Sequence, residues 1–189
     1  MTYKSVVSEH KKVVDFYTRN ADVFSYPGKL KSAKYAFTEL AEAVDARMRA
    51  GNSSDLRRTD KQIDYHEEIG DCMVMLMAAL GLTDDDFQTS MRSIRTLLGR
   101  QHTDEIDLIN RTLLPFEIRV DVDRTISECG ISISSAMGCD EDYSKFANCI
   151  VNAIAQWDWT TYRMDYSLAK LERRCADKRA MAPKVMEMV

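Results

Sequence analysis

The stretch from Lys31 to Leu82 decides the fold, and it carries two short acidic signatures, Glu39-Leu-Ala-Glu42 and Glu68-Ile-Gly-Asp71. Each signature places two carboxylates three residues apart. On an α-helix this spacing corresponds to about 300° of turn and roughly 4.5 Å of rise, so both side chains leave the same face. Two such helices packed with these faces together would bring four negative charges to one point. Hard divalent cations such as Mg²⁺ or Mn²⁺ prefer oxygen ligands, so the pattern predicts a metal site.

The two helices that carry these signatures differ in their apolar residues. For the first helix, a helical wheel predicts an apolar stripe opposite the acidic pair. We expect this stripe to consist of Leu30, Ala33, Phe37, Leu40, Ala41, Val44 and Met48. In the second helix, the run from Cys72 to Leu80 is apolar on every side, which is typical of a buried helix. Asp71 and Glu68 are therefore expected in the interior, where carboxylates are rarely left without a partner.

Length and composition indicate a protein with a substantial core and no footprint for nucleic acid. The 189 residues are 45% hydrophobic and 30% charged, which suits one soluble domain or two small ones. The formal net charge of −4 offers no basic face for nucleic acid. The sequence has no run of about 18 apolar residues that would predict a membrane span, and no signal-peptide core near Met1. The five cysteines lack metal-site spacing, so we expect reduced thiols in a cytoplasmic protein.

The chain predicts an all-α fold, because its few glycines and prolines separate helical patterns and we find no convincing period-two alternation. We expect a helical bundle in a single domain spanning 1–189. The predicted helices cover 3–19, 29–50, 58–80, 83–99, 103–113, 117–137, 141–157 and 160–180, with a tail over 182–189. Gly51 and Gly81 mark the ends of the two acidic helices, and Thr83 is the expected cap of the next one.

A later segment echoes the second acidic helix. The residues from Glu128 to Gly138 repeat the order acid, Cys, branched apolar residues, Ala and Gly that runs from Asp71 to Gly81. Chance similarity between two amphipathic helices is one reading of this echo. The other is a chain of two degenerate helical units, with a catalytic unit over about 29–100 and an additional unit over about 103–180.

The acidic pattern resembles that of the MazG-like and dimeric-dUTPase-like all-α nucleotide pyrophosphohydrolases. Their pattern is Glu-Glu-x-x-Glu, a spacer, and then Glu-x-x-Asp. This sequence has Glu39-x-x-Glu42 followed by Glu68-x-x-Asp71, with Gly70 and Asp71 opening an apolar helix. The resemblance covers about 30–100 and has no firm counterpart over 103–160. Thr38 stands where the family has its first Glu, which puts any role of that acid in doubt here.

The resemblance implies that water attacks the α-phosphorus of a nucleoside triphosphate, with the deoxy form favoured, to give a monophosphate and pyrophosphate. It also implies one to three Mg²⁺ or Mn²⁺ ions at the catalytic acids Glu39, Glu42, Glu68 and Asp71. Contacts with the nucleotide are expected from Lys31, Tyr35, Arg95, Arg100, Lys170 and Arg173. Lys170-Leu-Glu-Arg-Arg174 looks like a basic segment of the family, and the sequence leaves open whether it or Arg95 with Arg100 binds the outer phosphates.

Two other functions fit the same residues. A non-enzymatic helical oligomer would use the acidic pairs in salt bridges on a solvated face and the eleven methionines as an adaptable protein-binding surface. A metal-dependent phosphohydrolase that cuts elsewhere in the phosphate chain would use the same acids. We expect a homodimer or homotetramer, because the apolar helices over 68–81, 117–137 and 146–157 exceed what one small unit covers. The base is not identified, and clearance of aberrant nucleotides and shaping of a dNTP pool in a host cytoplasm, as in phage-encoded relatives, both remain open.

Overall fold

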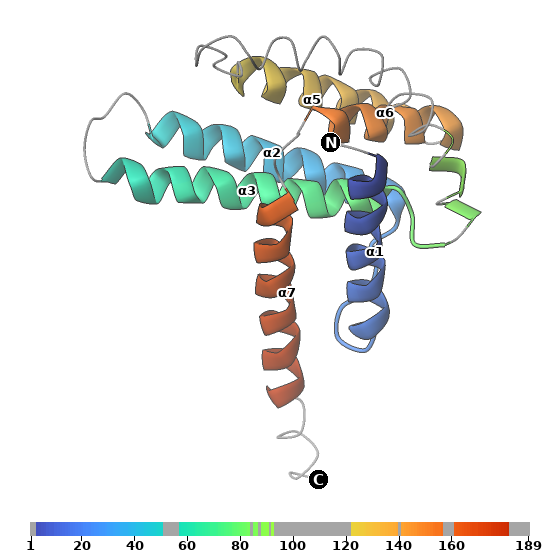
Figure 1. Ribbon diagram of the computed structural model, residues 1–189, viewed down its shortest axis with the longest axis horizontal. Coiled ribbons are helices and arrows are strands. Elements are labelled where there is room, and N and C mark those ends of the chain that lie inside the picture. Colours follow the sequence, from blue (N-terminus) through green and yellow to red (C-terminus); the bar gives the residue numbers. More distant parts are fainter. Residues whose placement is uncertain are drawn as a thin grey trace.

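The structure of the protein, a computed structural model, describes residues 3–50, 57–83, 85–86, 88–90, 92, 122–139, 141–156 and 161–181 (Figure 1). These residues form helices and turns and contain no strand, which confirms the predicted all-α class. The helices are α1 (Tyr3–Arg19), α2 (Lys29–Ala50), α3 (Arg57–Ala79), α5 (Val122–Met137), α6 (Tyr143–Ala155) and α7 (Thr161–Met181). Helical residues at 85–86, 88–90 and 92 fall in the helix predicted after Thr83. The predicted helix over 103–113 and the predicted tail lie outside the described residues.

Two pairs of neighbouring helices pack against each other, and a third pair runs at a steep angle to them (Figure 1). α2 lies along α3, and α5 lies along α6. α2 also contacts α5, and α3 contacts α6, so these two pairs pack against each other. α1 and α7 lie beside each other, contact α3, and extend away from the α5–α6 pair (Figure 1). None of the described helices combines the length and the apolar character that a membrane crossing requires.

α3 lies at the centre of these contacts because its second half has no polar face. It contacts α1, α2, α6 and α7. The side chains from Cys72 to Leu80 are all buried except the partly exposed Met75. Full burial of a Leu or Met side chain contributes about 1.5–3 kcal/mol, so this run is a main source of stability. The prediction of a helix that is apolar on every side and therefore buried is confirmed.

The buried face of α2 differs from the predicted stripe. Phe37 and Met48, two predicted members, are 42% and 76% exposed. The buried residues are Ser32, Ala33, Ala36, Leu40, Ala43 and Ala46. Their small side chains let the α2 backbone lie close to the broad apolar surface of α3, where larger side chains would hold the helices apart. Ala36 and Ala43 flank Glu39 on its own face, so the prediction that the acidic pair lies opposite the apolar stripe is wrong.

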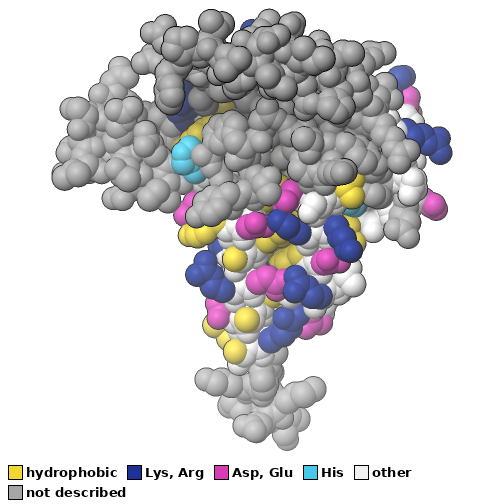
Figure 2. Space-filling model, viewed as in Figure 1, with side chains coloured by type: hydrophobic (Ala, Val, Ile, Leu, Met, Phe, Trp, Pro, Cys, Tyr) yellow, Lys and Arg dark blue, Asp and Glu magenta, His cyan; other side chains and the backbone are white. Residues whose placement is uncertain are grey.

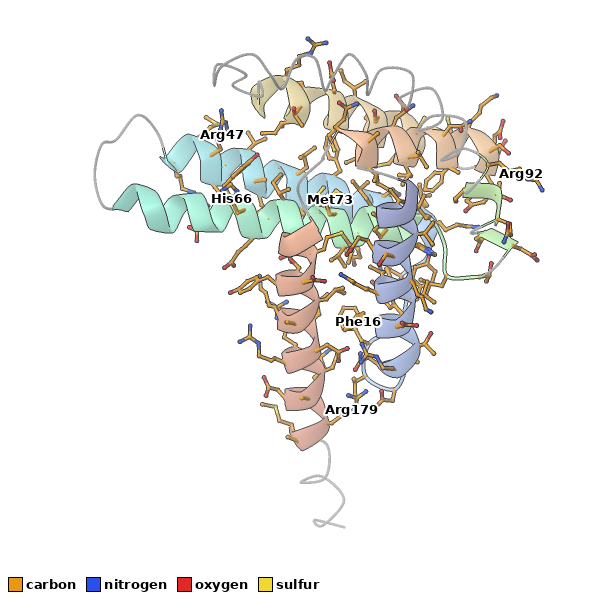
Figure 3. The ribbon with its side chains drawn as sticks, viewed as in Figure 1. Phe16, Arg47, His66, Met73, Arg92 and Arg179 are labelled. Atoms are coloured by element: carbon orange, nitrogen blue, oxygen red, sulfur yellow. The ribbon has the colours of Figure 1, made fainter. Side chains whose placement is uncertain are left out.

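Ion pairs and an aromatic core hold α1 beside α7. Lys12 on α1 lies 2.7 Å from Asp165 on α7, measured from Nζ to Oδ1. Near the other end of α7, Arg179 pairs with Asp22 at 2.6 Å. Phe16, which is 1% exposed, lies between the two helices (Figure 3). On the face shown in Figure 2, positive and negative side chains are interspersed over this helix pair.

The turn after α3 joins several elements. Gly81 has a φ of +90°, in the left-handed region that favours glycine, and its carbonyl oxygen accepts a 2.6 Å hydrogen bond from the ring of buried His10. The Thr83 hydroxyl accepts from the backbone N–H of Asp86 at 3.2 Å, as expected of the predicted cap. The Asp86 carboxylate pairs with Lys29 of α2 at 2.6 Å, which fixes the start of α2 against the end of α3.

All five cysteines are free thiols, as the sequence predicts, and three of them are buried. The thiols of Cys72 on α3 and Cys129 on α5 are hydrogen-bonded to each other, and this contact together with burial raises the pKa of Cys72. The Cys72 thiol therefore stays protonated in the core, and its contact with Cys129 helps to join the α2–α3 pair to the α5–α6 pair.

Candidate functional site

Carboxylates from α2 and α3 meet at one place along the paired helices. Oxygen atoms of Glu39 and Glu42 on α2 and of Glu68 on α3 all lie within 4.8 Å of one another. Glu39 and Glu68 are half-buried, whereas Glu42 is exposed. These are three of the four acids that the spacing predicts to converge. Three carboxylates at this separation form an oxygen-rich donor set that suits one hard divalent cation such as Mg²⁺ or Mn²⁺.

Glu39 and Glu68 hold a proton between them. Burial raises the pKa of Glu39 to about 7, and the neighbouring charges of Asp71, Glu42 and Glu68 add to this shift. Burial and the same kind of repulsion also raise the pKa of Glu68. The two carboxyl groups are also hydrogen-bonded to each other, which requires that one of them is protonated. This proton offsets repulsion within the cluster, and a divalent cation bound at the same place would displace it.

Asp71, the fourth predicted acid, has a cationic partner. It is not part of the mutually close set formed by the three glutamates in the described part of the chain. The Nζ atom of Lys170 on α7 lies 3.3 Å from Oδ2 of Asp71, and both side chains are partly buried. Burial lowers the pKa of Lys170, but the Asp71 carboxylate together with the charges of Glu67 and Glu68 raises it overall. The site therefore combines three clustered glutamates with an adjacent ion pair.

The other predicted nucleotide contacts lie at different distances from these acids. Tyr35 is one helical turn before Glu39 on α2 and is 43% exposed. Lys31 is one turn earlier, and its Nζ lies 5.7 Å from the centre of the Tyr35 ring. Arg173 is exposed on α7. Arg95 and Arg100 lie outside the described residues. The choice between these two arginines and the segment from Lys170 to Arg174 as the binder of the outer phosphates therefore stays open.

A pocket of about 340 Å³ lies beside the acids and was not predicted. It is formed by α1, the α1–α2 connection, α2, α3 and α7, and its lining includes Tyr17, Phe24, Lys31, Tyr35, Met75 and Lys178. The only local signal was the helical spacing of Lys31, Tyr35 and Glu39 along α2. Nothing in the sequence links Tyr17 to Lys178, because the packing of α1 beside α7 alone brings them to one pocket.

Comparison with protein-family models, with curated proteins and with solved structures found no match to this chain. The chemistry of the site is therefore read from its residues. Three glutamates suit a cation, and Lys170 provides an ammonium group next to them. The neighbouring pocket has aromatic walls and two further lysines. This combination is suited to a ligand that has both phosphate groups and an organic ring.

Proposed function

We propose that the chain is a metal-dependent nucleoside triphosphate pyrophosphohydrolase, which converts a nucleoside triphosphate and water to a monophosphate and pyrophosphate. The observation that carries this proposal is the meeting of Glu39, Glu42 and Glu68 oxygens within 4.8 Å. Both helices that supply them are anchored by the buried run of α3, so the acids are held on a rigid support. The resemblance of the two acidic signatures to those of all-α pyrophosphohydrolases supports the same reaction.

The residues of the site have distinct roles in this proposal. A divalent cation, when bound, neutralises phosphate charge and lowers the pKa of an attacking water. A carboxylate of the cluster that the bound cation leaves uncoordinated is suited to accept a proton from the attacking water. Lys170, held 3.3 Å from Asp71, provides a positive charge for a phosphate oxygen.

Product analysis tests the reaction. Purified protein is incubated with each common NTP and dNTP in Mg²⁺ or Mn²⁺, and pyrophosphate and orthophosphate are measured separately. We expect pyrophosphate in equal amount to the monophosphate, and loss of most activity in Glu39→Gln and Glu68→Gln. Glu128→Gln is the matched control, because Glu128 lies on α5 and pairs with Arg124. Orthophosphate as the first product would place the cut elsewhere in the phosphate chain, and parent rates in both site variants would place the site elsewhere.

Metal binding separates the enzyme from a non-enzymatic helical oligomer. A cation that binds only the folded state raises its thermal stability, and the increase grows with the logarithm of the cation concentration above the Kd. We expect Mn²⁺ to raise the Tm of the parent protein and of Glu128→Gln, and to leave the Tm of Glu39→Gln and Glu68→Gln nearly unchanged. An equal response in all four proteins would mean that the glutamate cluster does not hold the ion.

A further inference from the structure

We propose that the pocket beside the acids binds the base of the nucleotide and selects bases that carry exocyclic carbonyl oxygens. This inference rests on the proposed function, because it assigns the pocket to the substrate of the same site. It concerns the described residues of α1, α2, α3, α7 and the α1–α2 connection, which together enclose about 340 Å³.

The position of the pocket allows one nucleotide to reach both the glutamate cluster and the pocket. Tyr35 precedes Glu39 by four residues, and Met75 follows Asp71 by four, so each lies about 6 Å along its helix from an acid. α2 and α3 lie side by side and run in opposite directions, so both steps lead the same way (Figure 1). A nucleotide spans a similar length between its 5′-phosphate and its base. A phosphate at the glutamates therefore places the base in the pocket.

The walls of the pocket suit a flat ring. Tyr17 and Phe24 line it, with their ring centres 5.9 Å apart, and Tyr35 lies at its exposed side. Met75 adds a polarisable thioether from α3. Aromatic side chains stack on the faces of bases, and a phosphate group gains nothing from such walls.

One residue that lines the pocket has a buried hydroxyl group without a hydrogen-bond partner in the described part of the structure. Tyr17 is 3% exposed, and its hydroxyl has no hydrogen-bond partner among the described residues. Buried polar groups in folded proteins almost always have a partner, because an unpaired one loses its hydration without compensation. Burial, with a smaller effect of nearby Tyr35, raises the pKa of Tyr17 to about 12, so the hydroxyl keeps a proton to donate.

The two lysines that line the pocket are donors too, and Ser25 adds a hydroxyl that can donate or accept. Lysine ammonium groups donate hydrogen bonds and accept none. Lys178 donates to the carbonyl of Val23 at 3.4 Å and lies 5.4 Å from the centre of the Phe24 ring, which leaves donor capacity for a ligand. Lys31 lies over the Tyr35 ring. With the Tyr17 hydroxyl, these groups match the carbonyl oxygens of thymine, uracil, guanine or cytosine, whereas adenine has no carbonyl oxygen.

Nucleoside binding to the full chain tests this assignment without phosphate or metal. Thymidine, deoxyguanosine and deoxyadenosine are titrated and followed by saturation-transfer NMR. We expect the first two to bind about tenfold more tightly than deoxyadenosine, which corresponds to the loss of a hydrogen bond to a charged donor. Tyr17→Phe and Lys178→Met should each reduce this ratio towards one. Tyr166→Phe and Lys34→Met are matched controls, because neither residue lines the pocket.

Stability and hydrolysis separate the outcomes. Tyr17→Phe should keep or raise the Tm, because the hydroxyl it removes has no partner, so a loss of selectivity with an intact Tm supports the base pocket. Selective nucleoside binding without any hydrolysis would refute the proposed function and leave the base pocket in place. Hydrolysis with no nucleoside selectivity, or with unchanged selectivity in Tyr17→Phe and Lys178→Met, would overturn the base pocket. Displacement of thymidine by inorganic triphosphate without metal would assign the lysines to phosphate and overturn it as well.

Discussion

Glu39 makes the stability of the metal-free protein depend on pH. Its pKa in the folded state is about 7, above the 4.5 of an unperturbed glutamate. The folded state therefore binds more protons than the unfolded state between these values, and stability falls as pH rises through that window. Each pKa unit corresponds to about 1.4 kcal/mol, so about 3 kcal/mol is the upper limit of the loss, which solvent screening of a half-exposed group reduces.

Thermal unfolding in chelator between about pH 5 and about pH 8 measures this effect. We expect the Tm of the parent protein to fall over that range and the Tm of Glu39→Gln to fall less, so that the variant is the more stable protein at the alkaline end. Glu128→Gln should follow the parent curve, because Glu128 lies on α5, outside the glutamate cluster. Parallel curves for the parent and Glu39→Gln would contradict the raised pKa.

Substitutions at two glycines distinguish the cost of backbone strain from the cost of a steric clash. Gly28 and Gly81 have φ values of +88° and +90°. A Cβ at Gly28 would meet no atom within 4 Å, whereas one at Gly81 would lie 2.5 Å from Cβ of Asp86. We expect Gly28→Ala to lower the free energy of unfolding by about 1 kcal/mol from strain alone. Gly81→Ala should cost clearly more, about 2–4 kcal/mol, because it also displaces the partner of Lys29.

Urea unfolding of both variants gives the two free energies. Their difference reports the clash at the end of α3, since the backbone term is common to both. Equal losses in Gly28→Ala and Gly81→Ala would mean that the Asp86 turn moves aside without cost.

Among the helices, α5 carries the sequence echo of α3 but does not carry an equivalent set of acids. Glu128 takes the place of Asp71 in this echo, and its Oε1 accepts a 2.7 Å hydrogen bond from Arg124 on the same helix. The other acids that could complete a second set are Asp104 and Asp107, whose side chains are a methylene shorter than glutamate and which lie outside the described residues. We therefore expect one active site per chain, on α2 and α3.

Mutations in the second unit test this expectation. Turnover of Asp104→Asn, Asp107→Asn and Glu128→Gln should stay within a few-fold of the parent rate, and titration should find one nucleotide per chain. Two nucleotides per chain would contradict a single site. A loss in Glu128→Gln equal to that in Asp71→Asn would show that α5 takes part in the chemistry.

The helices were predictable where the signals are local. The spans 3–19 and 29–50 agree with α1 and α2, and the predicted end of the second acidic helix at Gly81 agrees with α3. Capping groups and glycine act within one or two turns, so they can be read from the sequence. The buried face of α2 was predicted wrongly, because the prediction favoured large apolar side chains over the small ones that allow close helix packing. The close contact with α3 selects Ala36 and Ala43 and leaves Phe37 at the surface.

The site was predictable only as far as it lies on α2 and α3. The spacing of the acidic signatures predicted that their carboxylates would converge. The two helices that carry them are consecutive in the sequence and contact each other, so this convergence needs no distant part of the chain. Lys170 was one of several basic candidates, and its contact with Asp71 depends on how α7 packs against α3. The pocket depends on the same packing, since Tyr17 and Lys178 belong to the two helices that cross α3.

At the scale of the whole molecule, self-association stays a prediction, but it now depends on exposed apolar side chains and no longer on the apolar run of α3. The apolar run of α3 is covered within one chain by α1, α2, α6 and α7, so it no longer calls for a second copy. Exposed apolar side chains remain on α2, where Met48 is 76% exposed, and on α5, where Ile131 is 67% exposed. We expect a homodimer that covers part of this surface.

Light scattering at micromolar concentration measures the mass of the parent protein, Met48→Lys and Ile131→Lys. A dimeric parent with at least one variant shifted towards the monomer would support the interface. A monomeric parent at that concentration would contradict it. The control is Met181→Lys, since Met181 is also exposed, at 70%, but lies on α7.

Because α1 packs against α7, it cannot complete its packing until α7 has been translated. α1 is the first of the described helices to leave the ribosome and α7 the last, yet Lys12 pairs with Asp165 and Arg179 with Asp22. Until α7 has emerged, Phe16 lacks the partner that covers it in the finished protein (Figure 3). A contact between segments so distant in sequence also carries a large loop-closure cost. Nascent chains that stop before α7 should therefore expose this aromatic face and bind chaperones, and translation through α7 should release them.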